Sequence, residues 1–399
     1  PDHGRYQRLA KQHIQKHDDQ RRVENMQGQT GLVKRTKVLG TAGDDIVQHQ
    51  RDHGQWLIVP AYCGGTERFA QESPRQPGGI NVAALLTEPG QKAYARLKAA
   101  VLNDTAIGAR RKNMTTGKIG SLSVGRLVSG SNLISLNMHA RDLGYVQPLA
   151  ARYNTEERVF MTLKKCEEQG INTIVLKDHN FRQFRLSDYG REWGGKLQWI
   201  ADVITTDINQ FEALLEEHLA LGAAAAYLWG GASDTWYFHK KPGNIVRAFE
   251  IMKRYKIPVG IAAHRLEPIA FCEKEGLVPD FYMKTLHHDR YWSAHPRENR
   301  RYMEMFEKES PNHAEYHDNL FCHDCEATVE FMQEVKVPWI AFKVLAAGAI
   351  PPEDGFRFAF ESGADFICVG MFDFQVERYA EVARRAVAAA QKRPRPWRG

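Results

Sequence analysis

The stretch GNIVRAFEIMKRYKIPVGIAAHRLEPIAFCEKEGLVPDFYMKTLHH, residues 243–288, alternates between helix and strand patterns. Apolar residues recur at helical spacing over 243–256, whereas 258–266 and 280–288 are nearly continuous apolar runs of strand length. Gly276 stands where the second helix would end, because glycine readily adopts the left-handed conformation that closes a helix. Apolar strands that alternate with helices are typical of a parallel sheet covered by helices.

The same alternation extends over residues 114–399. Helical patterns occur over 155–170, 209–222 and 327–336, and several of the predicted helices end at a glycine. The strand-like runs are 124–135, 172–178, 196–204, 223–231, 258–266, 280–288, 339–348 and 365–374. Eight such units predict a (β/α)8 barrel, the TIM-barrel architecture of the α/β class. A doubly wound open sheet is the alternative, but no glycine-rich dinucleotide turn follows any early strand.

Residues 1–113 differ from the rest of the chain. They hold 18 Lys and Arg against 11 Asp and Glu, and only five aromatic residues, whereas residues 114–399 hold 36 against 37 and 36 aromatic residues. Such a segment buries too little apolar surface to offset the entropy cost of ordering it. We expect 1–113 to be a poorly ordered or non-native extension, with the natural start at Met114. A small accessory domain is the alternative.

Composition narrows the classes of partner. The net charge of +6 comes wholly from the first segment, so the predicted barrel carries no basic surface of the kind that nucleic acid requires. No run of 18 apolar residues is present, which predicts that the chain does not span a membrane. Six cysteines in 399 residues make no disulfide framework, which favours a reduced, cytoplasmic location. We expect a small-molecule substrate, and composition leaves the oligomeric state open.

Two lysines lie within predicted strands. The active site of a (β/α)8 barrel lies at the carboxyl ends of its strands. Lys284 and Lys343 lie in neighbouring runs, and a mid-strand lysine is expected to point into the upper barrel interior. Proximity of two amines and burial both lower a lysine pKa, which makes Lys284 a candidate Schiff-base nucleophile supported by Lys343. Alternatively, each lysine pairs with an acid or binds a substrate carboxylate or phosphate.

Histidines offer a second chemistry at the same strand ends. His264 ends the fifth run, and His287 and His288 end the sixth. Two imidazoles from adjacent strands, with Asp178 or His179 across the mouth, are suitable ligands for a divalent metal. Such a metal would polarise a carbonyl group or an enediolate. The alternative is that these residues transfer protons as acids and bases without a metal.

The connection over residues 289–326 is long for a compact barrel, which predicts a lid or specificity loop. It contains the motif Cys322-x-x-Cys325, which His317 and His323 could complete to a zinc site. The motif occurs once, so an ordinary pair of loop cysteines is the alternative.

Glycines and aromatic residues also gather at the predicted mouth. Gly348 and Gly370 follow strands seven and eight, where backbone amides of many barrels hold a ligand or cofactor phosphate. Alternatively, both glycines serve only tight turns. Aromatic side chains near the mouth suit sugar rings or close the top of the barrel, and these are Trp229, Trp236, Tyr237, Tyr291 and Trp292.

Two stretches, KIGSLSVGRLVSGSN (118–132) and GINTIVLKDHN (170–180), resemble the start of the aldo/keto reductase family. The resemblance implies a (β/α)8 barrel and an NADPH-dependent carbonyl reductase with an Asp-Tyr-Lys-His tetrad. Val175 stands where the Asp is expected and Asn180 about where the Tyr is expected. The third and fourth runs end without the Lys and the His. The chain therefore resembles a divergent bacterial branch that lacks the tetrad, for which ordinary hydride transfer is not expected.

These observations predict an enzyme that acts next to a carbonyl group, by proton transfer or as a lyase or isomerase, on a sugar-like or hydroxy-carbonyl compound. The predicted catalytic residues are Lys284, Lys343, His264, His288 and Asp178. The predicted metal ligands are His264, His287 and His179. A divalent metal is preferred over NAD(P)H as the cofactor. The alternatives are a divergent NAD(P)H-dependent reductase and a non-catalytic binding barrel, and buried lysines argue against the latter.

Overall fold

The computed structural model describes residues 113–136, 138, 143–176, 185–294, 297 and 322–399, together with three short strands nearer the N-terminus. These strands are β1 (Lys37–Leu39), β2 (Ile46–Gln50) and β3 (Trp56–Pro60), which pair antiparallel in that order. They belong to a compact unit over 18–99, and residues 100–399 belong to another. The remainder of 1–112 lies outside the described residues, so the expected character of this extension stays a prediction.

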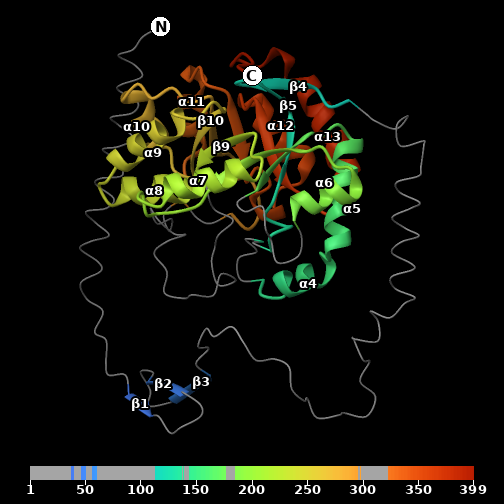
Figure 1. Ribbon diagram of the computed structural model, residues 1–399. Coiled ribbons are helices and arrows are strands. Elements are labelled where there is room, and N and C mark those ends of the chain that lie inside the picture. Colours follow the sequence, from blue (N-terminus) through green and yellow to red (C-terminus); the bar gives the residue numbers. More distant parts are fainter. Residues whose placement is uncertain are drawn as a thin grey trace, which may run out of the picture. The chain divides into compact units, whose positions relative to one another are not determined.

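Eight parallel strands close into a barrel in chain order, from β6 round to β13 and back to β6 (Figure 1). Each of the eight predicted runs contains one of these strands, which confirms the (β/α)8 architecture. The strands are β6 (Leu127–Gly130), β7 (Thr173–Leu176), β8 (Gln198–Val203), β9 (Ala225–Leu228), β10 (Val259–Ala263), β11 (Phe281–Thr285), β12 (Trp339–Phe342) and β13 (Phe366–Gly370).

The described chain has ten α-helices, most of which form an outer layer around the strands (Figure 1). They are α4 (Val146–Tyr153), α5 (Glu156–Glu168), α6 (Leu186–Trp193), α7 (Phe211–Ala220), α8 (Gly230–Phe238), α9 (Gly243–Lys253), α10 (Glu267–Lys274), α11 (Cys325–Glu334), α12 (Pro352–Glu361) and α13 (Val376–Ala389), with short 3-10 helices η5 (Ala346–Gly348) and η6 (Ala390–Lys392). Left-handed glycines follow five of them, at the predicted positions Gly170, Gly222, Gly276 and Gly363 and also at Gly194 after α6. None of the described helices is long and apolar enough to cross a membrane.

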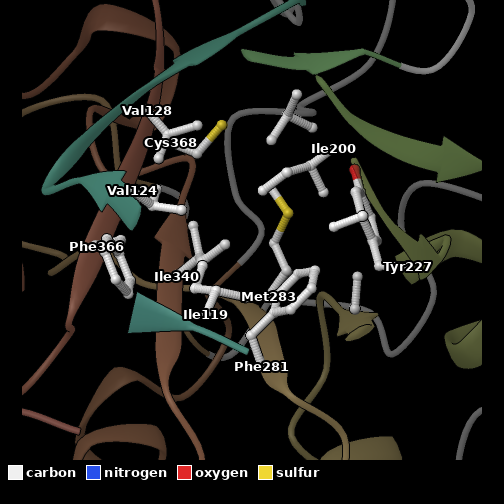
Figure 2. Close-up of a cluster of buried hydrophobic side chains, with 13 residues drawn as sticks. Ile119, Val124, Val128, Ile200, Tyr227, Phe281, Met283, Ile340, Phe366 and Cys368 are labelled. Carbon is white, nitrogen blue, oxygen red and sulfur yellow. The ribbon is translucent and has the colours of Figure 1, made fainter. Parts of the chain in front are cut away.

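Alternate residues of each strand face the barrel interior. Figure 2 shows Phe281 and Met283 of β11 in a buried cluster with side chains of other strands. Because strand side chains alternate between faces, Lys284 lies on the outer side of the wall. Tyr282, two residues earlier, faces the same way, and its hydroxyl donates to Glu273 Oε1 of α10 at 2.9 Å. The expectation that Lys284 points into the barrel is therefore wrong, because β11 places Met283 there.

A hairpin packs against the interior cluster near the start of the barrel. It consists of β4 (Thr116–Ile119) and β5 (Leu122–Gly125), which pair antiparallel. Ile119 and Val124 of the hairpin belong to the same buried cluster as Phe366, the first residue of β13. These apolar side chains fill the end of the barrel opposite the carboxyl ends of the strands. The open end, where sites form in this architecture, is therefore the other one.

The C-terminal tail is fixed to the barrel by a buried ion-pair network. Asp365 precedes β13 and contacts Arg393 Nη2 through Oδ1 at 2.7 Å and Arg395 Nη1 through Oδ2 at 2.6 Å. All three side chains are at most 1% exposed. Arg395 donates further hydrogen bonds to the backbone carbonyls of Met332, Val335, Val337 and Gly363. A guanidinium whose donors are satisfied in this way can be buried at tolerable cost.

We expect Asp365→Asn to lower the free energy of unfolding by about 3–5 kcal/mol, because it leaves two buried guanidinium groups without their counter-charge. Urea unfolding of the full chain measures the effect. Glu353→Gln is the matched control, since it breaks an ion pair with Arg378 whose side chains are 49% and 64% exposed. The control should cost less than about 1 kcal/mol. Equal effects of the two substitutions would contradict the assigned role of Asp365.

Candidate active site

An aspartate and a histidine form a dyad at the carboxyl ends of β9 and β10. Asp234 lies in α8, and His264 directly follows β10. Asp234 Oδ2 lies 2.8 Å from His264 Nδ1 and also accepts the His264 backbone N–H at 3.0 Å. Its Oδ1 accepts the backbone N–H of Arg265 at 3.1 Å. An ionised carboxylate only accepts hydrogen bonds, so His264 carries its proton on Nδ1 and its lone pair on Nε2.

Local sequence explains how α8 comes so close to β10. Gly230 is the first residue of α8, and a Cβ atom there would lie 3.3 Å from Ala263 Cα and from His264 Cε1. A larger residue would push the helix away from the strand. Asp234, one helical turn later, then reaches the backbone and ring of His264 while it is only 1% exposed.

Burial lowers the pKa of His264 below its ordinary value. The positive charges of Lys343 and Lys284 lower this pKa further, while the hydrogen bond and charge of Asp234 oppose the shift. His264 is therefore neutral at neutral pH. A neutral imidazole with its lone pair on Nε2 and its Nδ1–H held by a carboxylate is suited to act as a general base.

Lys343 lies in a strained turn immediately after β12. Its φ is 57°, and Ala346 and Ala347 have φ of 45° and 55°. The left-handed region costs a residue with a Cβ atom roughly 1–2 kcal/mol, and such strain clusters at functional sites. The positive charge of Lys343 contributes to the lowered pKa of His264, as does that of Lys284.

Lys284 has a different environment from the one expected. It is 1% exposed, and its Nζ donates to Thr285 O at 3.0 Å and to Thr285 Oγ1 at 2.8 Å. No carboxylate of the described residues forms an ion pair with it. Burial is the largest cause of its lowered pKa. Because Lys284 lies behind the barrel wall, we do not propose it as a Schiff-base group.

His287 and His288 are both engaged in hydrogen bonds with neighbouring segments. The backbone N–H of Cys322 donates to His287 Nε2 at 3.2 Å, and His287 Nδ1 lies 3.2 Å from the carbonyl of His288. His288 accepts the N–H of Arg290 at Nδ1, at 3.1 Å, and its Nε2 lies 2.9 Å from Asp354 Oδ2 of α12. Both rings are buried and hydrogen-bonded through both nitrogens. They therefore link the end of β11 to neighbouring elements.

Among the described residues, no group of three or more His, Cys, Asp or Glu side chains could hold a metal ion. Asp178 and His179 lie outside the described residues, as does His317. Cys322 and Cys325 are buried free thiols at the start of α11. The described residues therefore do not support the predicted divalent-metal site or the predicted zinc site. Both sites stay predictions.

Backbone conformation accounts for Gly348 and close packing for Gly370, whereas the aromatic residues of the predicted mouth differ in exposure. Gly348 has a φ of 89°, which a turn requires, and a Cβ at Gly370 would lie 3.2 Å from Leu133 Cγ. Trp236 is buried, and its Nε1 donates to the carbonyl of Thr206 at 3.0 Å. Trp292 is 96% exposed. These contacts explain the two glycines without a phosphate, whose binding there stays a prediction.

Sequence reasoning missed two polar features. Asp234 had no predicted role, although the adjacency of consecutive strands in a barrel could have suggested its pairing with His264. Tyr227 of β9 faces the interior and hydrogen-bonds Asp202 of β8. Burial and the Asp202 charge raise the Tyr227 pKa well above its ordinary value. This tyrosine therefore has a carboxylate as its neighbour.

No protein-family model matches the chain, and no curated protein matches it. Among solved structures, one described as "Putative aldo-keto reductase from Pseudomona aeruginosa" is 16% identical, with a TM-score of 0.44 over 72% of this chain and 99% of its own. A second structure with that description is 14% identical, with a TM-score of 0.46 over 70% and 99%. A "putative dihydrodipicolinate synthetase from Pseudomonas aeruginosa" is 10% identical, with a TM-score of 0.33 over 59% and 77%. These likenesses concern the barrel fold and assign no reaction.

We expect the stability of the wild type relative to Lys284→Met to increase as the pH rises towards 10.5. Because burial depresses the folded pKa of Lys284, the unfolded chain binds more protons between that pKa and 10.5, so the wild type gains up to about 1.4 kcal/mol per pH unit there. Urea unfolding of both proteins across this range measures the difference. Lys274→Met, at an exposed position of α10, should show no such trend. A pH-independent difference for Lys284→Met would contradict the assignment.

Proposed function

We propose that the chain is an enzyme that removes a proton from a carbon next to the carbonyl group of a small hydroxy-carbonyl compound. His264 is the general base in this proposal. The observation that carries it is the 2.8 Å contact between Asp234 Oδ2 and His264 Nδ1 at the carboxyl end of the barrel strands. Active sites of (β/α)8 barrels lie at this end, and an Asp-His dyad is a recurrent proton-transfer unit.

The dyad supplies the chemistry of the first step. The Nε2 lone pair of His264 accepts the substrate proton, and the electron pair of the broken C–H bond moves to the carbonyl oxygen, which becomes an enolate oxygen. Asp234 stabilises the imidazolium that forms and keeps the proton of the free base on Nδ1. In a hydroxy-carbonyl compound the product of this step is an enediolate, and protonation of its former carbonyl carbon makes the reaction an isomerisation. Loss of a leaving group from the carbon on the other side of the deprotonated carbon, with formation of a C=C bond, makes it a lyase reaction.

Lys343 supplies the complementary charge. An enolate oxygen needs a positive group or a hydrogen-bond donor held in place before the reaction, because preorganised charge contributes most to such steps. Lys343 follows the strand next to β11, and its charge already acts on the pKa of His264. The left-handed turn over residues 343–347 fixes the direction in which the chain leaves β12. We assign Lys343 to the substrate carbonyl oxygen or to a carboxylate of the substrate.

We expect the wild type to exchange the C–H hydrogen next to the carbonyl of at least one hydroxy-aldehyde, hydroxy-ketone or 2-oxo acid in D2O, as proton NMR would show. His264→Gln should abolish this exchange, and Asp234→Asn should slow it about 10²–10⁴-fold by removing the acceptor that orients the ring. His239→Gln is the matched control, an exposed histidine that caps α8. The exchange rate should stay constant as the pH falls to about 6.5 and decline only below it, because burial lowers the pKa of His264.

Two outcomes would contradict the proposal. Exchange that survives His264→Gln would remove His264 as the base. Oxidation of NADPH by the same carbonyl compounds, without exchange at the neighbouring carbon, would instead support the reductase function that the family resemblance implies.

A further inference from the structure

Two side chains hydrogen-bond to the backbone of His264, one to its N–H group and one to its carbonyl oxygen. Asp234 accepts its N–H at 3.0 Å, and the hydroxyl of Thr285 donates to its carbonyl at 2.8 Å. The ladder between β10 and β11 ends with the pair Ala263 and Lys284, so His264 lies beyond the last strand pair. A side-chain donor is therefore needed to fix its carbonyl. Thr285 fills that role from the end of the neighbouring strand.

Lys284 fixes the hydroxyl of Thr285 in turn. Its Nζ donates to Thr285 Oγ1 at 2.8 Å and to the Thr285 carbonyl at 3.0 Å. A hydroxyl group has one hydrogen and rotates to suit its partners. With the amine donating to Oγ1, the hydroxyl hydrogen is left to point at the carbonyl of His264. Three groups on two adjacent strands thus form a chain from behind the barrel wall to the backbone of the proposed base.

We propose that Lys284 and Thr285 are positioning residues that hold His264 against Asp234, an inference that rests on the proposed function of His264. The chain of donors runs from Lys284 Nζ to Thr285 Oγ1 and from there to the carbonyl oxygen of His264. Neither residue touches the substrate. Their effect is to fix the peptide from which the His264 ring projects, so that Nδ1 and the backbone N–H both reach one carboxylate oxygen.

The cost of burying Lys284 argues for such a role. A buried amine without an ion pair is expensive, and an apolar side chain of similar length would fill the space between β11 and the helix layer at lower cost. A side chain whose only role was to fill the space between β11 and the helices would not need an amine. The amine donates to Thr285, whose hydroxyl holds the His264 carbonyl. A displacement of the base by about 1 Å can slow a proton transfer by roughly 100-fold.

The test compares Thr285→Val, Thr285→Ser and Lys284→Met in the full chain with two readouts. In exchange assays, Thr285→Val and Lys284→Met should each lower the maximal rate about tenfold or more while KM changes by less than about threefold. Thr285→Ser keeps the hydroxyl and should restore the rate to within about threefold of the wild type. In NMR spectra of protein with 15N-labelled histidine, the Nδ1–H form of His264 should dominate in the wild type and in Thr285→Ser. The fraction of His264 in the Nδ1–H form should fall in Thr285→Val and in Lys284→Met.

The NMR readout needs no substrate, so it separates this inference from the proposed function. If the wild type exchanges no carbonyl compound but the His264 tautomer responds as described, the proposed function fails and the positioning role stands. If Thr285→Val and Lys284→Met fold and leave both rate and tautomer unchanged, the positioning role is overturned. Equal loss in Thr285→Ser and Thr285→Val would also overturn it, because the hydroxyl would then not matter. Should Thr285→Val fail to fold, Lys284→Met and Thr285→Ser decide on the same criteria.

Discussion

Closure of the sheet fixes the side of the wall on which each strand residue lies. Strand side chains alternate between faces, and a closed sheet has no edge at which the alternation can be reset. Phe281 and Met283 face the interior, so Lys284 faces the helix layer. On the neighbouring strand, Ala262 faces the interior, and the same alternation brings His264 to the mouth. The identity of the proposed base therefore follows from this constraint.

The buried charged groups at the two ends of the barrel differ in whether they form ion pairs. At the closed end, Asp365 meets two guanidinium groups, so the buried charges are paired and hydrogen-bonded. At the open end, Lys284 is buried without an ion pair among the described residues, and the turn after β12 holds non-glycine residues in the left-handed region. Fully paired charges stabilise a fold, whereas unpaired groups and strain must be supported by the rest of it. This contrast distinguishes the end of the barrel with paired charges from the end at which the proposed site lies.

The sequence predicted the architecture well because the period of apolar residues reports local structure directly. All eight strands lie within their predicted runs, and left-handed glycines follow the helices as expected. The direction of Lys284 was not predictable from its apolar surroundings, because both faces of a barrel strand are buried and only the register decides between them. The pairing of Asp234 with His264 joins residues 30 positions apart on different elements. It depends on the close approach that Gly230 permits, which no spacing rule describes.

The interior of the barrel holds a tyrosine beside a carboxylate. Tyr227 and Asp202 face each other on β9 and β8, and the carboxylate helps to hold the pKa of the phenol well above its ordinary value. Such a tyrosine is a poor proton donor at neutral pH, whereas a neighbouring lysine would ease loss of its proton. The proposed function therefore assigns proton transfer to His264, whose pKa burial lowers. The architecture positions side chains and the side chains decide the reaction, so the barrel fold alone assigns no chemistry to this chain.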